Sequence, residues 1–291
     1  MPAKLAAQPK RLLFSGLVLI LVFSAWCFSL FEGGPAALSE RASCKATDCS
    51  DMFAIRIRFH TQMQPLDYGF VVDDLRFYLH KLELLGSDGQ VFSIHLDSSS
   101  TNRGIALVDL SRDSTAVING WVSGDARSEN IHSLGFTLGV PFASNHANPL
   151  HAEKPLNESS MYWVWQQGYK FFKLDIRALS GQDFSFHMGS AGCESASALR
   201  PPSLNCSYPN RARIVLGVPD LQNLVVGVDP WLVLTTMQEQ QVQLCSAASN
   251  FSDKCSYVLE LFGIDPLTGL CLDKCSAQKL FSRHIDVPVD V

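Results

Sequence analysis

The sequence predicts a mostly β protein, an antiparallel β-sandwich or barrel-like domain with disulfide-bearing loops behind an apolar N-terminal segment. Three observations support this prediction. Short runs of alternating apolar and polar residues follow one another, separated by turn-forming residues. Helical periodicity is weak throughout the chain, and eight cysteines follow the apolar segment. Many short strands between turns are typical of β-sandwiches and barrels.

The N-terminal segment predicts export. Lys4, Lys10 and Arg11 precede a run without charged residues over positions 12–31. This is the layout of a secretory signal or signal anchor, and the run is long enough to span a bilayer. We expect a periplasmic or cell-envelope protein; retention in the inner membrane by residues 12–31 and cleavage nearby both stay open. The predicted organisation is a signal peptide or anchor at 1–31, a linker at 32–50 and one β domain at 51–291.

Charge and cysteine content narrow the class of protein. The formal net charge of −5 argues against a nucleic-acid partner. An even number of cysteines in an exported chain predicts disulfides. The nearest-neighbour scheme is one of 105 pairings, and spacing alone does not prove it. A zinc site at the C-terminal cysteines is disfavoured, because they lack a Cys-x-x-Cys pair. The nearest-neighbour pairs are Cys44–Cys49, Cys193–Cys206, Cys245–Cys255 and Cys271–Cys275.

Period-two alternation defines the predicted strands. From Met52 onward, Phe53, Ile55, Ile57 and Phe59 alternate with polar or small residues, and the stretch 75–80 alternates in the same way. A strand at 91–96 follows a Gly-Ser-Asp-Gly turn. The only plausible helices lie at 235–245 and after Lys254. Further strands are expected at 131–138, 161–164, 169–176, 184–188, 213–218 and 224–234.

Histidines provide the candidate metal ligands. His60, His80 and His95 fall on polar faces of predicted strands, where a solvated side chain is the simplest interpretation. His146 lies in a partly apolar loop, and alternation turns His187 away from the apolar face of its strand. Imidazole is a common ligand of copper and zinc. From spacing alone, a hydrogen-bonded structural role for each histidine remains the alternative.

The other candidate groups are two tryptophans. In a strand, Trp163 and Trp165 would project to the same face, which favours a place in the core over a modified or redox-active role. Motifs of enzymes such as Gly-x-Ser-x-Gly, His-Glu-x-x-His or a Walker loop are missing from the sequence. We therefore expect a binding protein rather than an enzyme.

Four blocks of residues follow one another along the chain. They are Asp74-Leu75-Arg76-Phe77-Tyr78-Leu79; Val140-Pro141-Phe142 with Asn145-His146; Trp163-x-Trp165-Gln166-x-Gly168-Tyr169-Lys170-Phe171; and His187-Met188-Gly189-Ser190-x-Gly192-Cys193 with Cys206 and Pro209-Asn210-Arg211. In this order they resemble the MbnP family, also described as the four-Cys motif protein of a metallo-mystery pair. The resemblance covers about residues 52–280, and the ordered set is far more specific than any single block.

This resemblance implies a periplasmic copper-binding protein whose partner is a di-haem protein related to cytochrome c peroxidases and MauG. In the family the partner oxidises a tryptophan to kynurenine, and related methanotroph surface proteins bind copper through histidines and a kynurenine. Carried onto matching positions, it implies His146 and His187 as ligands and Trp163 or Trp165 as the modified residue. It also pairs Cys193 with Cys206, and Cys271 with Cys275 as the later pair.

Two departures from the family pattern stand out, the extra cysteines and the long apolar segment. The leading hypothesis is an exported copper-handling protein that is a substrate of its haem partner and not a catalyst. A metal-free, membrane-anchored structural or interaction protein is the first alternative. A copper-dependent oxidase or oxygenase is the second, and it would require an open coordination position and a substrate cleft.

Overall fold

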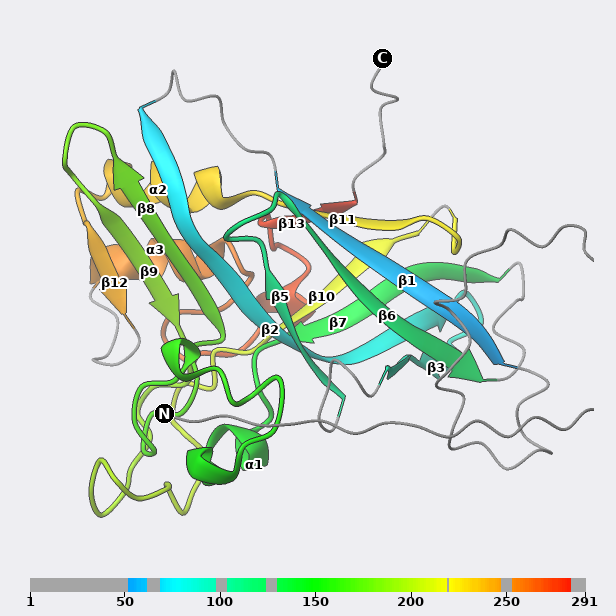
Figure 1. Ribbon diagram of the computed structural model, residues 1–291, viewed down its shortest axis with the longest axis horizontal. Helices are drawn as coiled ribbons and strands as arrows, with labels where there is room; N and C mark the ends of the chain where they lie inside the picture. Colours follow the sequence, from blue (N-terminus) through cyan, green and yellow to red (C-terminus); the bar gives the residue numbers. More distant parts are fainter. Residues whose placement is uncertain are drawn as a thin grey trace, which may run out of the picture. The chain divides into compact units, whose positions relative to one another are not determined.

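The computed structural model describes residues 52–61, 69–97, 104–123, 130–218, 220–246 and 253–283. The predicted signal or anchor, the linker, Cys44 and Cys49 lie outside these residues. The described chain forms two β-sheets with three α-helices, α1 to α3, beside them (Figure 1). The predicted mostly β fold is confirmed, and both sheets also contain a parallel pair of strands.

The five-stranded sheet, called sheet A here, is built around β1 (Met52–Thr61). This strand runs parallel to β11 (Leu224–Val228) and antiparallel to β6 (Thr115–Ser123). Ile55, Ile57 and Phe59 of β1 are buried, as the predicted alternation requires. Two short strands, β4 (His95–Leu96) and β13 (Phe281–Arg283), form its edges.

The eight-stranded sheet, sheet B, is built around the 17-residue strand β2 (Phe70–Gly86). The first half of β2 pairs with β8 and its second half with β7, while β5 and β3 pair along the opposite edge. The remaining strands extend the sheet on both sides. The bounds are β3 Val91–Ser93, β5 Ile105–Asp109, β7 Ile131–Leu138, β8 Phe172–Ala178, β9 Phe184–Met188, β10 Ala212–Gly217 and β12 Leu244–Ser246.

An irregularity at Lys81 divides β2 into two parts. The register with β7 shifts between His80 and Glu83, and Lys81 has a φ of 53°. The buried leucines of β2 stand at positions 75 and 79 before the shift and at 82 and 84 after it, so they change from odd to even positions. An extra residue in a strand turns the side chains that follow it to the other face. The bulge therefore lets β2 bury apolar side chains both where it pairs with β8 and where it pairs with β7.

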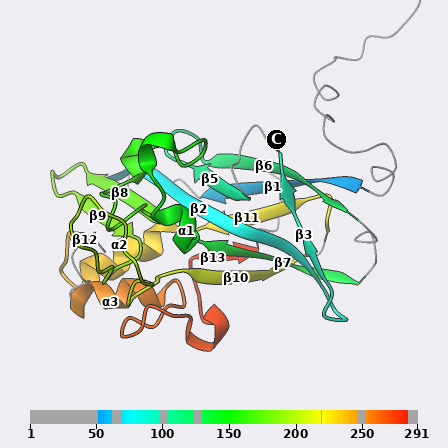
Figure 2. The same ribbon diagram turned by 90° about the horizontal axis from the view of Figure 1, so that it is seen from below.

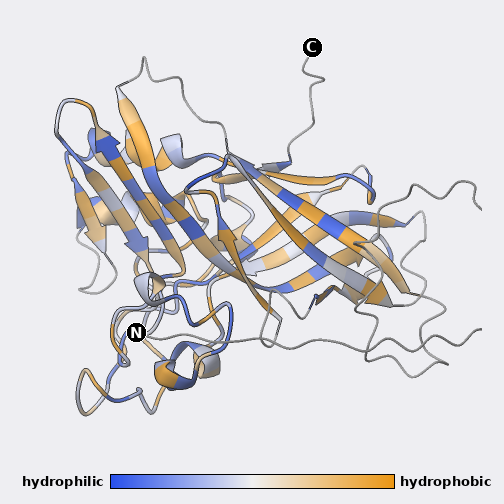
Figure 3. Cartoon of the chain, in the orientation of Figure 1, coloured by the Kyte–Doolittle hydropathy of each residue, from blue (hydrophilic) through white to orange (hydrophobic). Residues whose placement is uncertain are grey.

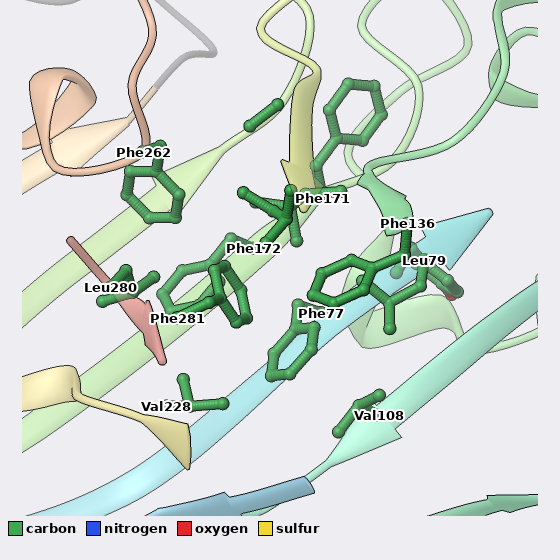
Figure 4. Packing of buried hydrophobic residues seen from close by; sticks show 14 of the residues in the cluster. Phe77, Leu79, Val108, Phe136, Phe171, Phe172, Val228, Phe262, Leu280 and Phe281 are labelled. Carbon is green, nitrogen blue, oxygen red and sulfur yellow. The ribbon is translucent and has the colours of Figure 1, made fainter. Parts of the chain in front are cut away.

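The core lies between the two sheets and is rich in phenylalanine. Phe281 of β13 meets Phe77 of β2 and Phe136 of β7 edge to face, with ring centroids 5.6 and 5.5 Å apart. Phe59 of β1 makes the same kind of contact with Phe77 and Phe136. Figure 4 shows Phe77, Phe136 and Phe281 of this cluster, and Figure 3 shows apolar and polar residues along the strands.

Helices α2 (Pro230–Glu239) and α3 (Asp253–Glu260) lie by the β8–β9–β12 part of sheet B (Figure 2). The prediction of one strand over 224–234 was wrong beyond Val228. Asp229 caps α2 by accepting a hydrogen bond from the Trp231 backbone N–H, and Pro230 occupies the first helical turn. Both features favour a helix start at this point over a continued strand.

The segment between β7 and β8 also differs from the prediction. Residues 161–164 do not form a strand; the short 3₁₀ helix η3 (Ser159–Met161) precedes a turn that carries both tryptophans. A single bridge, Tyr162 to Tyr169, joins the two sides of this turn. Strands β5 and β6 were not predicted. Predicted strand 91–96 divides into β3 and β4, which belong to different sheets.

Candidate functional site

His146 lies at the end of the four-residue helix α1 (Phe142–Asn145), in the segment that follows β7. Its side chain is 6% exposed, and the Phe142 ring packs on the imidazole with centroids 4.8 Å apart. The prediction that this loop is partly apolar is confirmed. The loop holds the imidazole inside the protein instead of presenting it to water.

The hydrogen bonds of His146 define its tautomer. The Tyr169 backbone N–H donates to Asn145 Oδ1 at 2.8 Å, so the amide nitrogen of Asn145 is the atom that faces His146 Nε2, at 3.0 Å. Nε2 must then accept, and Nδ1–H donates to the Trp165 carbonyl oxygen at 3.2 Å. Burial lowers the pKa of His146, although its hydrogen bond to Trp165 opposes this shift. The imidazole is therefore neutral, with a lone pair on Nε2.

Trp165 and His146 are joined by a second hydrogen bond in the opposite direction. The Trp165 indole N–H donates to the His146 carbonyl oxygen at 2.8 Å. Both Trp163 and Trp165 are only half-buried, so the prediction that they belong to the core was wrong. The reason is that the segment turns at Val164, where Gln167 and Gly168 donate backbone hydrogen bonds to the Val164 carbonyl oxygen.

Trp163 occupies a different environment, beside the end of β9. A Cβ added to Gly189 would lie 2.6 Å from the Trp163 ring, so this ring packs directly on the glycine. The ammonium group of Lys170 lies 6.0 Å from the centroid of the same ring. Each predicted tryptophan is thus packed by its own set of neighbours.

His187 lies on β9 with its side chain on the partly exposed face of sheet B, as alternation predicted. Its Nε2 is 2.8 Å from Asp175 Oδ1 on the neighbouring strand β8. Burial alone would raise the pKa of Asp175, but hydrogen bonds from His187 and Ser185 outweigh burial and lower it. Lys173 bridges Asp175 and Asp74, which extends a row of charged side chains across the sheet.

The two predicted ligands do not share any contact among the residues that the structure describes. His146 meets Asn145, Trp165 and Cys206, whereas His187 meets Asp175. Each imidazole nevertheless has one nitrogen hydrogen-bonded to an oxygen, Nδ1 of His146 to the Trp165 carbonyl and Nε2 of His187 to the Asp175 carboxylate. Metal-binding histidines are usually oriented in this way, by a carbonyl or carboxylate on the nitrogen that does not face the metal.

His80 was expected to be solvated, and that prediction was wrong. Its Nδ1 is 2.9 Å from the Gly139 carbonyl oxygen, and burial lowers its pKa to about 4. The positive charge of Arg211 contributes to lowering the pKa of both His80 and His146. The polar face of β2 is covered at this point by the connection between β7 and β8, a non-local contact that strand alternation does not predict.

Within the described residues there are three disulfides, Cys193–Cys206, Cys245–Cys255 and Cys271–Cys275. They confirm three of the four nearest-neighbour pairs and both pairs implied by the resemblance. Such bonds form in oxidising compartments, which agrees with an exported protein. Within the described part of the chain, no helix is long and apolar enough to cross a membrane, and the predicted anchor segment 12–31 lies outside it.

One disulfide belongs to the surroundings of His146. Cys206 Sγ is 3.5 Å from His146 Nε2, and the ligand atoms of His146, Cys193 and Cys206 all lie within 4.8 Å of one another. Beside Cys193 is a pocket of about 510 Å³. Spacing gave no signal for this association, because His146 and Cys206 are 60 positions apart. The pocket is lined by Gln166, Gln167, Ser190, Ala191, Gly192, Cys193, Glu194 and Ser195.

A model of the MbnP family matches residues 50–249 of this chain, which include His146, both tryptophans and His187. The chain belongs to the MbnP family. The solved structure of MbnP from Methylosinus trichosporium superposes with a TM-score of 0.63 at 18% sequence identity. The match covers 80% of this chain and 98% of that one. No curated protein sequence matches the chain.

Membership of the MbnP family confirms the resemblance that the four blocks indicated. The similarity to the Methylosinus protein extends over the β domain and establishes the common fold. It assigns no role to individual residues at this level of identity, so the ligands and the modified tryptophan rest on the contacts described above.

Proposed function

We propose that this protein is an exported copper-binding protein whose metal centre is built on His146. The observation that carries the proposal is the buried, neutral imidazole whose Nδ1–H donates to the Trp165 carbonyl oxygen, so that Nε2 is the ring nitrogen with the lone pair. Nε2 accepts from the Asn145 amide in this structure, and copper would take the place of that hydrogen bond. A neutral nitrogen donor in a largely apolar setting suits copper, whereas magnesium and calcium require hard oxygen ligands. Membership of the MbnP family supports the same assignment.

Trp165 is the residue that we propose to be oxidised to kynurenine. Opening the indole between its two pyrrole carbons and losing one carbon yields an aryl amine that can act as a further nitrogen ligand. Trp165 is hydrogen-bonded to His146 in both directions, whereas Trp163 packs on Gly189 and Lys170. A di-haem partner related to cytochrome c peroxidases and MauG supplies the oxidant, so the protein is the substrate of that reaction and not a catalyst.

His187 is retained as the second predicted ligand. Its Nε2 is engaged by Asp175, which leaves Nδ1 as the donor atom for copper. Because His187 and His146 have separate contacts in this structure, we expect the two histidines to contribute unequally. His146 should carry the greater part of the affinity.

Copper titration of the wild type against His146→Ala and His187→Ala tests this assignment. We expect the larger loss of affinity for His146→Ala, and exposed His151→Ala serves as the control. Equal affinity of all four proteins would exclude a centre at either histidine. A loss of copper affinity in His187→Ala alone would show that the metal centre lies at β9 and not at His146.

Peptide mapping of protein purified from its native host tests the modification. Conversion of an indole to kynurenine adds about 4 Da to the peptide, since one carbon is lost and one oxygen gained. We expect this gain in the wild type and in Trp163→Phe, but not in Trp165→Phe. A mass gain that is absent only from Trp163→Phe would show that Trp163, and not Trp165, is the modified residue. Oxygen consumption by the copper-loaded protein would contradict the proposal that it is not an enzyme.

A second candidate function, a metal-free interaction protein, is favoured by exposed leucines on the connecting loops. Leu150, Leu199 and Leu204 are 88%, 75% and 72% exposed, so a partner that covered them would remove apolar surface from water. This alternative predicts unmodified tryptophans and no bound copper after expression together with the haem partner. Mass spectrometry and metal analysis of the same sample separate the two functions.

A further inference from the structure

The Cys193–Cys206 disulfide is the only one of the three in the described chain whose sulfurs form a group with a histidine. Cys193 and Cys206 are 8% and 6% exposed, and His146 is equally buried. In the disulfide form the sulfurs are not thiolates, and the thiolate is the form that binds metals. In the oxidised protein the His146 imidazole is therefore the only good metal ligand of this group. Reduction of the S–S bond would add the two cysteine thiolates.

The backbone holds these two cysteines together independently of their covalent bond. Ala191 and Tyr208 exchange two backbone hydrogen bonds of 2.9 and 3.0 Å, and Ser207 N–H donates to the Gly192 carbonyl oxygen at 3.1 Å. The Gln166 side chain donates to the Cys193 carbonyl oxygen at 2.9 Å. If the disulfide were reduced, these contacts would keep both sulfurs beside His146.

The same group is reachable from outside the protein. Cys193 forms part of the wall of the 510 Å³ pocket, together with the side chains of Gln166 and Glu194. Cys245 and Cys255, by contrast, are 0% and 2% exposed, and neither lines this pocket. A reductant and a metal ion thus have a route to Cys193 that the Cys245–Cys255 disulfide lacks.

We propose that Cys193–Cys206 is a redox switch that, once reduced, creates a thiolate–thiolate–imidazole site for Cu(I) with His146. A dithiol reductant donates two electrons and two protons, its own sulfurs form a disulfide, and the Cys193–Cys206 bond becomes two thiols. Both thiols release their protons when the metal binds. Two soft sulfur donors and one nitrogen select Cu(I), and zinc is the nearest competitor. The proposal rests on the proposed function only in taking copper as the metal, and it does not require an oxidised tryptophan.

The first test uses the full wild-type chain without substitutions. The protein is reduced anaerobically with a phosphine, loaded with Cu(I) against a chromogenic Cu(I) chelator, and alkylated before mass mapping. We expect Cu(I) to protect Cys193 and Cys206 from alkylation, while the cysteines of any other reduced disulfide react. Equal alkylation of Cys193 and Cys206 with and without Cu(I) would overturn the proposal.

The second test compares matched disulfide variants after the same reduction. The wild type and the Cys271→Ser/Cys275→Ser double variant should gain a tightly held Cu(I) equivalent with thiolate-to-copper ultraviolet absorption. Cys193→Ser/Cys206→Ser should lose both signals, and His146→Ala should keep the absorption but bind Cu(I) at least tenfold more weakly. Absorption and affinity that persist in Cys193→Ser/Cys206→Ser would exclude the site.

Two outcomes distinguish this inference from the proposed function. Copper binding by the oxidised wild type, with no gain on reduction, would support the proposed function and reject the switch. Cu(I) bound by thiolates in the reduced protein, with no copper bound by the oxidised protein, would support the switch and reject the proposed function.

Discussion

His80 and His146 show how burial determines the chemistry of a side chain. In both imidazoles one ring nitrogen is hydrogen-bonded to a backbone carbonyl oxygen. Both also have a lowered pKa, because burial disfavours the charged ring. Arg211 adds to the effect at both positions. A neutral imidazole is the form that binds metals, so these residues remain competent as ligands at a pH where exposed histidines are protonated.

The low pKa of His80 predicts a specific dependence of stability on pH. Its pKa is about 4 in the folded protein and 6.5 ordinarily. Between these values the unfolded chain binds a proton that the folded protein does not, so stability falls as pH falls from 6.5 to 4. The slope is about 1.4 kcal/mol per pH unit, with a total of about 3 kcal/mol. Denaturant unfolding at several pH values should show this slope reduced in His80→Asn, which keeps a donor for Gly139.

Exposed His132→Asn is the control for that experiment. We expect its pH dependence to match the wild type. If His80→Asn also matched the wild type throughout this range, His80 would not be the neutral, buried group that the structure describes.

Gly168 sets the position of Asn145 and through it that of His146. It has a φ of +77°, and an added Cβ would lie 2.4–2.5 Å from the Asn145 side chain. Gly181 also has a positive φ, +90°, but an added Cβ there meets nothing within 4 Å. Gly181→Ala should cost about 1 kcal/mol of backbone strain. Gly168→Ala should cost a further 1–3 kcal/mol, roughly the cost of overpacking, and should weaken copper binding. Equal unfolding free energies for the two variants would contradict the contact.

At the scale of elements, Tyr78 ties the connection between β7 and β8 to sheet B, and Tyr169 joins two parts of that connection. The Tyr78 hydroxyl on β2 donates to the Pro155 carbonyl oxygen at 3.1 Å, and the Tyr169 hydroxyl donates to the Leu156 carbonyl oxygen at 2.7 Å. The two rings pack edge to face with centroids 5.7 Å apart. Burial raises the pKa of Tyr169 to about 12, so its hydroxyl stays a donor.

Removal of these hydroxyls should loosen the connection without unfolding the sheets. Tyr78→Phe and Tyr169→Phe should each destabilise the protein by about 1 kcal/mol, because a carbonyl oxygen loses its partner. The double variant should increase amide hydrogen exchange over residues 153–161 while β1 and β6 stay protected. Half-exposed Tyr257→Phe is the control. Unchanged exchange in the double variant would show that other contacts hold this connection.

At the scale of the whole molecule, the phenylalanine cluster joins the two sheets. Phe281 is 3% exposed and reaches from a short edge strand of sheet A to Phe77 and Phe136 of sheet B. Phe281→Ala should destabilise the protein by about 3–5 kcal/mol, since it removes a buried ring and leaves a cavity. Phe281→Leu should cost much less. Calorimetry measures both, and a loss below about 1 kcal/mol for Phe281→Ala would mean that the sheets close without this ring.

Local patterns predicted the parts of the protein that depend on neighbouring residues. Alternation gave β1, residues 75–80 of β2 and β9 with most of their buried side chains, because a strand packed on one side has a period of two. It also gave the strand β7, but Tyr78, which it placed on the polar face of β2, is buried. Cysteine spacing gave three pairs that the structure confirms. The ordered blocks gave the family, which the family model confirms. Copper, the ligands, the modified tryptophan and the haem partner remain proposals.

Only the tertiary structure decided what surrounds each candidate group. Trp163 and Trp165 lie outside the core because the backbone turns at Val164. His80 is partly buried because the segment after β7 contacts its side chain at Gly139. His146 met Cys206 across 60 positions of sequence. Alternation and spacing describe how side chains are arranged within one segment. Burial, pKa and ligand geometry depend on which segments pack together, and that is determined by contacts between residues far apart in the chain.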